Sequence, residues 1–94
     1  MKMFIYSVYD SAAAVYMRPF FEMTDSSAMR MFGDISVDVE HPIGKHPEHY
    51  SLYRIGIWDD ANARIEPEEG VCIARAHELV AHRQAIQGNS GGSD

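Results

Sequence analysis

The chain has 94 residues, a formal net charge of -6 at pH 7, a hydrophobic content of 46%, and ten aromatic residues (five tyrosines, four phenylalanines and one tryptophan). This length supports one domain with a modest core, which favours binding or self-assembly over an enclosed active site built from many residues. The acidic balance is the wrong sign for holding nucleic acid by bulk electrostatics, so any such binding requires a local patch.

The N-terminal segment has the composition of β-structure. Its first ten residues, MKMFIYSVYD, are rich in aromatic and β-branched side chains and end in a turn signal at Asp10-Ser11. A second extended run covers residues 15–23 and contains Pro19, which cannot donate a ladder hydrogen bond. The two runs predict a hairpin whose second strand lies at a sheet edge or bends at the proline, although the alanines at 12–14 also fit a helical turn.

A short helix and a loop are expected next. Thr24 or Asp25 is a suitable N-cap, and the segment SSAMRMF places apolar side chains on one helix face before Gly33. Prolines and glycine then interrupt residues 34–49, which predicts a surface loop.

The segment YSLYRIGIWDD shows the clearest strand pattern in the chain. Strict alternation predicts two faces, with Tyr53, Ile55 and Ile57 on one and Leu52, Arg54, Gly56 and Trp58 on the other. The following DDANA predicts a turn, and residues 64–66 a short fourth strand that ends at Pro67.

The C-terminal segment predicts an amphipathic helix over residues 74–87 that stops at Gly88. Leu79, Val80 and Ile86 would face the core, and residues 88–94, GNSGGSD, would form a flexible tail because they have nothing to bury. The expected organisation is therefore one domain over residues 1–87. Its order, β-β-α-β-β-α, predicts an α+β fold in which an antiparallel sheet of about four strands carries helices on one face. The other face would remain open to solvent, a ligand or a second subunit.

The stretch AHELVAHR comes close to the H-E-x-x-H zinc motif without matching it. His77 and His82 are five residues apart, which separates them by roughly 140° around a helix, so they cannot share one ion. His41, His46 and His49 lie beside prolines at spacings that fit no closed metal site, and we expect no metal or cofactor. There is no nucleophile elbow, P-loop or dinucleotide turn, and the expectation is a protein that is not an enzyme.

The single cysteine, Cys72, excludes an internal disulfide and lies in the apolar run VCIA, so it is interpreted as a buried structural thiol. The start of the chain has no apolar signal region, and no apolar run reaches membrane-spanning length. We therefore expect a protein of the cytoplasm, without a membrane partner.

The aromatic residues are interleaved with cations, which is the composition of sheet surfaces that hold single-stranded nucleic acid. Such surfaces stack aromatic rings on unpaired bases and place arginines on phosphates. Strand alternation predicts that Arg54 shares a face with Trp58, that Tyr16 shares one with Arg18 and Phe20, and that Tyr53 and Trp58 point to opposite faces. The candidate DNA-binding residues are Lys2, Tyr16, Arg18, Phe20, Tyr53, Arg54, Trp58 and Arg64.

Two segments, YSVYDSAAAVYMRPF and HPEHYSLYRIGIWDDANARI, resemble the small nonstructural DNA-binding protein of gokushoviruses, the single-stranded DNA bacteriophages of the Microviridae. The resemblance covers about residues 1–66, and its most specific part is residues 47–56. It implies a noncatalytic phage protein, made in the host bacterial cytoplasm, that binds DNA and assists the switch from genome replication to single-strand synthesis and packaging.

The acidity of the chain favours single-stranded DNA as the partner, and a homodimer would join two weak patches by avidity. The alternative is a protein-interaction module that uses the same open face to bind a viral or host replication or packaging protein.

Overall fold

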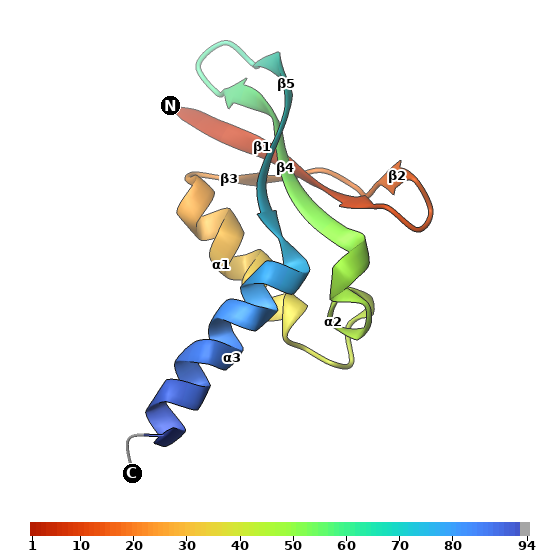
Figure 1. Cartoon of the computed structure of the whole chain (residues 1–94). Coiled ribbons are helices and arrows are strands. Elements are labelled where there is room, and N and C mark those ends of the chain that lie inside the picture. The colour runs from red at the N-terminus through yellow and green to blue at the C-terminus, as the bar shows by residue number, and fades with distance from the viewer. Residues whose placement is uncertain (93–94) are drawn as a thin grey trace.

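The computed structural model describes the backbone of residues 1–92 and the side chains of residues 1–86. It shows an α+β fold, as predicted, with a curled antiparallel sheet and helices gathered on one side (Figure 1). The elements are β1 (Lys2–Asp10), β2 (Val15–Tyr16), β3 (Phe20–Glu22), α1 (Asp25–Ser36), α2 (Pro42–Lys45), the 3-10 turn η1 (Pro47–His49), β4 (Tyr50–Asp59), β5 (Arg64–Arg75) and α3 (Ala76–Gly92). The sheet order is β2-β1-β4-β5, and β3 also pairs with β1.

Two short strands share one edge of β1. Tyr16 in β2 pairs with Tyr9, and Phe21 in β3 pairs with Ile5, so both strands run antiparallel to β1. The chain leaves the sheet between them at Pro19, which has no backbone N–H to give to the ladder. The predicted hairpin, with an edge strand broken at the proline, is therefore confirmed. Ala14 closes the turn at a positive φ of 58°.

Strand β5 is much longer than the sequence predicts. It continues through Pro67 to Arg75, so the prediction that the strand ends at Pro67 was wrong, and α3 begins at Ala76 instead of residue 74. Proline is tolerated because β5 is the edge strand of the sheet and Pro67 faces Gly56 at an irregularity of the ladder.

The helices also differ from the sequence prediction. Thr24 caps α1 as expected, because its Oγ1 accepts a hydrogen bond of 3.0 Å from the Ser27 amide. The helix does not end at Gly33 but continues to Ser36. Residues 34–49, predicted as a loop, contain α2 and η1, and the Nδ1 atom of His41 caps α2 by accepting a bond of 3.1 Å from the Ile43 amide.

Helix α3 passes the predicted stop at Gly88 and runs to Gly92. Residues 88–92 are therefore helical, where a tail was predicted, and the last two residues of that predicted tail lie outside the described part of the chain. Ser90, Gly91 and Gly92 do not interrupt the helix either, because intrinsic propensity is only a weak determinant of where a helix ends. None of the helices in residues 1–92 is long and apolar enough to cross a membrane.

The core lies between the helices and one face of the sheet. Its fully or almost fully buried side chains come from β1, β4 and all three α-helices: Tyr6, Val8, Ala28, Phe32, Ile43, Leu52 and Ala76. Every strand residue in this set faces the helices, so the opposite face of the sheet is left without a covering helix (Figure 1). That open face is the surface on which the sequence prediction placed binding.

Candidate nucleic-acid interface on the open sheet face

A bulge in β4 decides which side chains reach the open face. Tyr6 pairs with Arg54 and Ile5 pairs with Gly56, so Ile55 has no partner on β1 and the alternation of β4 reverses there. As a result Tyr53 and Trp58, which pair with Ser7 and Met3, point to the same open face. The prediction that they face opposite sides was wrong.

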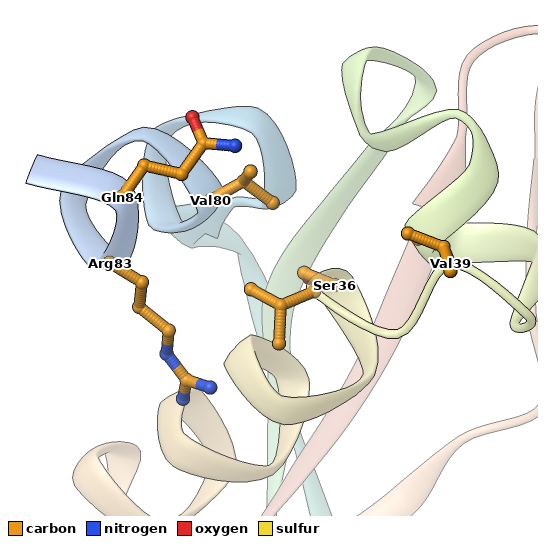
Figure 2. Close-up of a pocket in the computed structure, with 7 residues that line it drawn as sticks. Ser36, Val39, Val80, Arg83 and Gln84 are labelled. Atoms are coloured by element: carbon orange, nitrogen blue, oxygen red, sulfur yellow. The ribbon is translucent and has the colours of Figure 1, made fainter. Parts of the chain in front are cut away.

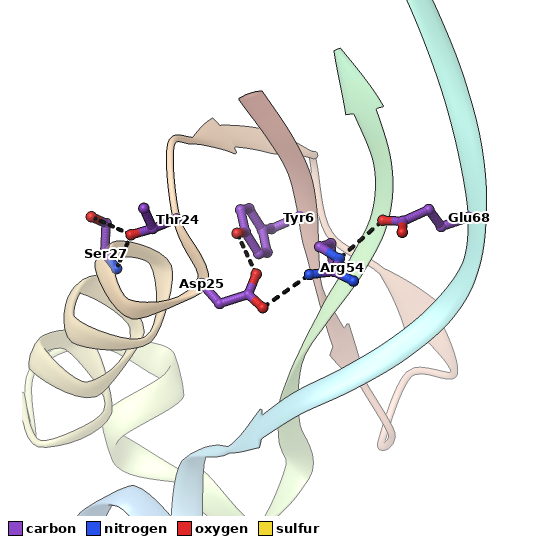
Figure 3. Close-up of polar contacts among 6 residues, drawn as sticks. All are labelled: Tyr6, Thr24, Asp25, Ser27, Arg54 and Glu68. Atoms are coloured by element: carbon purple, nitrogen blue, oxygen red, sulfur yellow. Dashed lines mark hydrogen bonds and ion pairs between the residues drawn. The ribbon is translucent and has the colours of Figure 1, made fainter. Parts of the chain in front are cut away.

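The same bulge turns Arg54 toward the helices, so the prediction that it shares a face with Trp58 was also wrong. Its Nη1 lies 2.9 Å from Asp25 Oδ2 and its Nε lies 3.0 Å from Glu68 Oε1 (Figure 3). The guanidinium also sits 4.8 Å from the ring centre of Phe4. The side chain is 23% exposed. Arg54 therefore joins β4, α1 and β5, and its charge is engaged within the protein.

Tyr6 completes this polar network. Its hydroxyl donates a hydrogen bond of 2.7 Å to Asp25 Oδ1 (Figure 3), and its side chain is fully buried. Burial, reinforced by the bond to Asp25 and the charge of that carboxylate, raises the pKa of Tyr6 well above its ordinary value of 10.0.

The raised pKa of Tyr6 predicts alkaline loss of stability. A group whose pKa is higher in the folded state contributes stability fully below its unfolded pKa and loses that contribution as the pH rises toward the folded value. The free energy of unfolding should therefore fall above about pH 10, by up to about 1.4 kcal/mol per pH unit. Urea denaturation from pH 8 to 11 checks this. The stability gap between wild type and Tyr6→Phe should narrow above pH 10, and a constant gap would contradict the assignment.

Three tyrosine rings meet on the open face, and we call Tyr9, Tyr16 and Tyr53 the tyrosine cluster. The ring centres of Tyr9 and Tyr16 are 4.7 Å apart, and that of Tyr53 lies 5.6 Å from Tyr16 and 6.3 Å from Tyr9. Tyr16 is 55% exposed, which leaves its ring accessible. Tyr53 is more enclosed, and burial together with the neighbouring Cys72 raises its pKa.

Arg75 provides a positive charge beside the tyrosine cluster. It pairs with Ser51, which in turn pairs with Tyr9, so all three residues share the open face. Its side chain is 55% exposed and makes only a long contact of 3.5 Å with Glu78. An exposed pair of this kind contributes little and can be exchanged for another anion.

The other end of the open face is apolar. Trp58 pairs with Met3 on one side and Ile65 on the other, and the rings of Trp58 and Phe21 pack edge to face at 6.2 Å. We call Met3, Phe21, Trp58 and Ile65 the apolar end.

The remaining predicted site residues are scattered. Phe20 stacks on Tyr6 at 5.7 Å between ring centres, so it faces the helices, and the prediction that it shares a face with Tyr16 was wrong. Lys2 and Arg64 are exposed and both pair with Asp59, and Arg18 is exposed in the link before Pro19. The structure thus unites Tyr16, Tyr53 and Trp58 on one face but not Phe20 or Arg54.

Sequence reasoning missed Tyr9, Phe21 and Arg75 as site residues. Tyr9 in β1 pairs with Tyr16 in β2 across the turn that joins these strands, and the position of the turn could have indicated this pairing. Arg75 was assigned to the helix, because VCIAR was read as a lead into α3 and not as the end of a strand. Cys72, interpreted as buried, is half-buried on the open face opposite Tyr53.

A pocket of about 430 Å³ between α1, α2 and α3 is a second place for a ligand (Figure 2). It is lined by Ser36, Val37, Val39, Gly44, Val80, Arg83 and Gln84. Its one lining cation is already engaged, because Arg83 Nη1 lies 3.0 Å from Asp34 Oδ1 and the guanidinium extends toward α1. The pocket therefore offers no free charge to a ligand.

The histidine-rich segment lies away from the open face. His46 and His49 stack with ring centres 5.6 Å apart, and both contact Glu48 at 3.7 and 3.8 Å. Among the residues that the structure describes, no group of three or more histidine, cysteine, aspartate or glutamate side chains is arranged to hold a metal ion.

The family of the chain follows from comparison with known proteins. A family model described as "Phage ORF5 protein" matches residues 3–79, which include all of the sheet except its first residue, Lys2, and the start of α3. The chain belongs to this family of phage proteins. Searches of curated proteins and of solved structures each found no match.

Proposed function

We propose that this phage protein binds single-stranded DNA through the tyrosine cluster, with Arg75 and Arg18 near the backbone phosphates. The observation that carries the proposal is the grouping of three tyrosine rings on a sheet face that no helix covers. Aromatic rings on an open sheet face stack unpaired bases without regard to sequence, at roughly 1–3 kcal/mol per base. Base pairs in a duplex do not expose their faces, so single strands are the preferred substrate.

The charge of the protein is compatible with this mode of binding because stacking provides most of the affinity. A net charge of -6 opposes any binding that depends on the overall field. Two arginines near the phosphates would release few counterions, which for single strands gives a slope of about -1.4 in log K against log salt. A shallow salt dependence is therefore expected, in contrast to proteins that hold DNA by charge.

The biological role that fits is noncatalytic. The resemblance to the gokushovirus nonstructural protein supports assistance in the switch from genome replication to single-strand synthesis and packaging, in the host bacterial cytoplasm. Coating of new single strands would keep them from serving as templates for the second strand. A phage lacking this protein should accumulate duplex genomes at the expense of packaged single strands.

Fluorescence anisotropy of labelled oligo-dT and a matching duplex, at low and physiological salt, tests DNA binding. We expect tighter binding to the single strand, weakened by Tyr16→Ala by roughly 5- to 100-fold, since one stacking platform is lost. Val15→Ala is the matched control, because Val15 is 53% exposed on the same strand and points to the other face. Equal losses in both variants, or no binding by folded protein, would refute the proposal.

The contribution of charge needs its own pair of variants. Arg75→Ala should weaken binding at low salt by several-fold and reduce the salt slope by about 0.7. Arg30→Ala removes the same charge from the exposed surface of α1 and should leave both quantities unchanged. A salt slope that Arg75→Ala leaves unchanged would contradict a contact between Arg75 and phosphate. Failure of the folded wild type to bind either form of DNA would instead favour the alternative, a module that binds a replication or packaging protein, for which the exposed apolar end is the supporting observation.

A further inference from the structure

The apolar end differs in chemistry from the tyrosine cluster, although both lie on the open face. Its side chains form a row across three strands, from Met3 through Trp58 to Ile65, with Phe21 beside it. Ile65 is 61% exposed and Phe21 is 44% exposed. Apart from the Trp58 indole N–H, these side chains have no polar atom, so they can satisfy neither phosphates nor base edges.

We propose that the apolar end is the interface of a homodimer, and that the apolar end of a second copy covers it. Large exposed apolar side chains that are contiguous mark interaction sites in small proteins. A two-fold contact brings the same patch of both copies together, so the surface must complement itself in shape and charge.

The shape of the apolar end allows a second copy to approach closely. Gly56, two residues before Trp58 on β4, lies on the open face between its pairing partners Ile5 on β1 and Pro67 on β5. A Cβ atom at this position would lie 2.9 Å from the Glu66 carbonyl oxygen and 3.5 Å from Ile5 Cδ1. The backbone is thus closely approached here, and glycine keeps the centre of the face low. A second sheet can then approach to the usual face-to-face distance of about 10 Å.

The charges around the apolar end also favour a second copy over an anionic partner. The edge beside the apolar end carries charges of both signs, the Met1 ammonium and the Asp60 carboxylate, whereas the charged side chains that alternate with the apolar residues point to the other face: Lys2, Glu22, Asp59, Arg64 and Glu66. The Met1 ammonium already lies 2.7 Å from Asp60 Oδ1. A rim of one sign would repel its own copy, whereas a mixed rim can pair across a two-fold axis. The tyrosine cluster lies at the other end of the open face, and the proposed interface does not depend on DNA binding.

The single tryptophan of the chain, Trp58, reports on this interface directly. Sedimentation velocity and Trp58 emission should be measured over a dilution series without DNA. We expect a dimer whose emission shifts to longer wavelength on dilution, as the indole enters water. Ile65→Glu should raise the dimer dissociation constant by at least roughly tenfold, because it places a charge within the apolar contact. Ile86→Glu is the matched control, since Ile86 is 52% exposed on α3, and this variant should remain dimeric.

Each other outcome would overturn the proposal. A wild-type monomer at high micromolar concentration shows that no second copy binds, and an Ile65→Glu variant that stays dimeric shows that the interface lies elsewhere. If Ile65→Glu fails to fold by circular dichroism, Phe21→Glu tests the same surface from β3. Quenching of Trp58 by oligo-dT in a monomeric wild type would assign the apolar end to DNA instead. Because dimerisation is measured without nucleic acid, its failure remains distinct from a failure of DNA binding.

Discussion

Replacing Arg54 by alanine is expected to lower the free energy of unfolding by about 2–3 kcal/mol. The variant leaves the carboxylates of Asp25 and Glu68 without their shared partner, at positions 37% and 25% exposed. Fully buried carboxylates left unpaired cost about 3–5 kcal/mol, and the partial exposure of these two lowers the expected value. The lost contact with Phe4 adds to the effect. Urea denaturation at one fixed protein concentration measures the change.

A double-mutant cycle separates the ion pair from the loss of side-chain volume. Arg54→Met keeps the apolar stem, and Glu68→Gln removes one of the two charges that Arg54 neutralises. If the pair stabilises the fold, the double variant will be more stable than the two single losses predict by at least about 0.5 kcal/mol. Arg18→Ala, which removes an exposed arginine, should leave the midpoint unchanged. An Arg54→Ala midpoint equal to wild type would refute the structural role of the network.

The position of Arg54 also decides how DNA-binding variants are interpreted. Alternation along the strand predicts that Arg54 lies beside Trp58 and contacts phosphate. Replacing Arg54 would then be the natural test of DNA binding. In the structure its guanidinium joins three elements and points away from the open face. Loss of DNA binding in Arg54→Ala would therefore follow from a displaced β5 or from unfolding. Arg75, exposed beside the tyrosine cluster, is the informative choice.

The sequence predicted the elements of the fold well where local chemistry determines them. Aromatic and β-branched runs gave β1 and β4, and the Thr24 hydroxyl caps α1 as its sequence position indicates. Pro19 broke the edge strand as expected, because a missing N–H acts in any context. These signals depend only on the residue and its immediate neighbours.

Features that depend on a pairing partner were not predictable. The bulge at Ile55 arises from the register between β1 and β4, and alternation within one strand contains no information about it. That single extra residue placed Arg54 and Trp58 on opposite faces and Tyr53 and Trp58 on the same face, and so removed Arg54 from the candidate site. Pro67 illustrates the same limit. A proline interrupts a strand in the interior of a sheet, but β5 lies at the free edge and continues through Pro67.

The segment predicted as a surface loop provides part of the core. Ile43 in α2 is 1% exposed and packs in the same cluster as Phe32 and Leu52. Pro42 and Pro47 suggested an irregular loop, but Pro42 occupies the first turn of α2, where no backbone donor is needed, and Pro47 follows the helix. The backbone of α2 also packs closely against Asp38 at Gly44, and a substitution at Gly44 tests this contact.

Gly44→Ala is expected to lower the free energy of unfolding by about 3 kcal/mol, or to release α2 from the core. A Cβ atom on Gly44 would overlap the carbonyl group of Asp38. The Asp38 carbonyl group cannot easily move aside, because it accepts a hydrogen bond of 3.0 Å from the His41 amide, and His41 in turn caps α2. Movement of α2 away from Asp38 would withdraw Ile43 from the core instead. Urea denaturation of wild type and Gly44→Ala measures the change in the free energy of unfolding.

Gly33→Ala is the matched control for this prediction. Its Cβ would approach only Arg83, whose Nη2 would lie 2.6 Å away at the end of a flexible side chain that can rotate. Alanine is also the better helix former, by about 0.5–1 kcal/mol, which offsets the cost of moving Arg83. The stability of Gly33→Ala should therefore stay within about 1 kcal/mol of wild type. Equal stability in the two variants would mean that α2 does not pack against the Asp38 backbone, and that the segment between α1 and β4 is the loop that its prolines suggest.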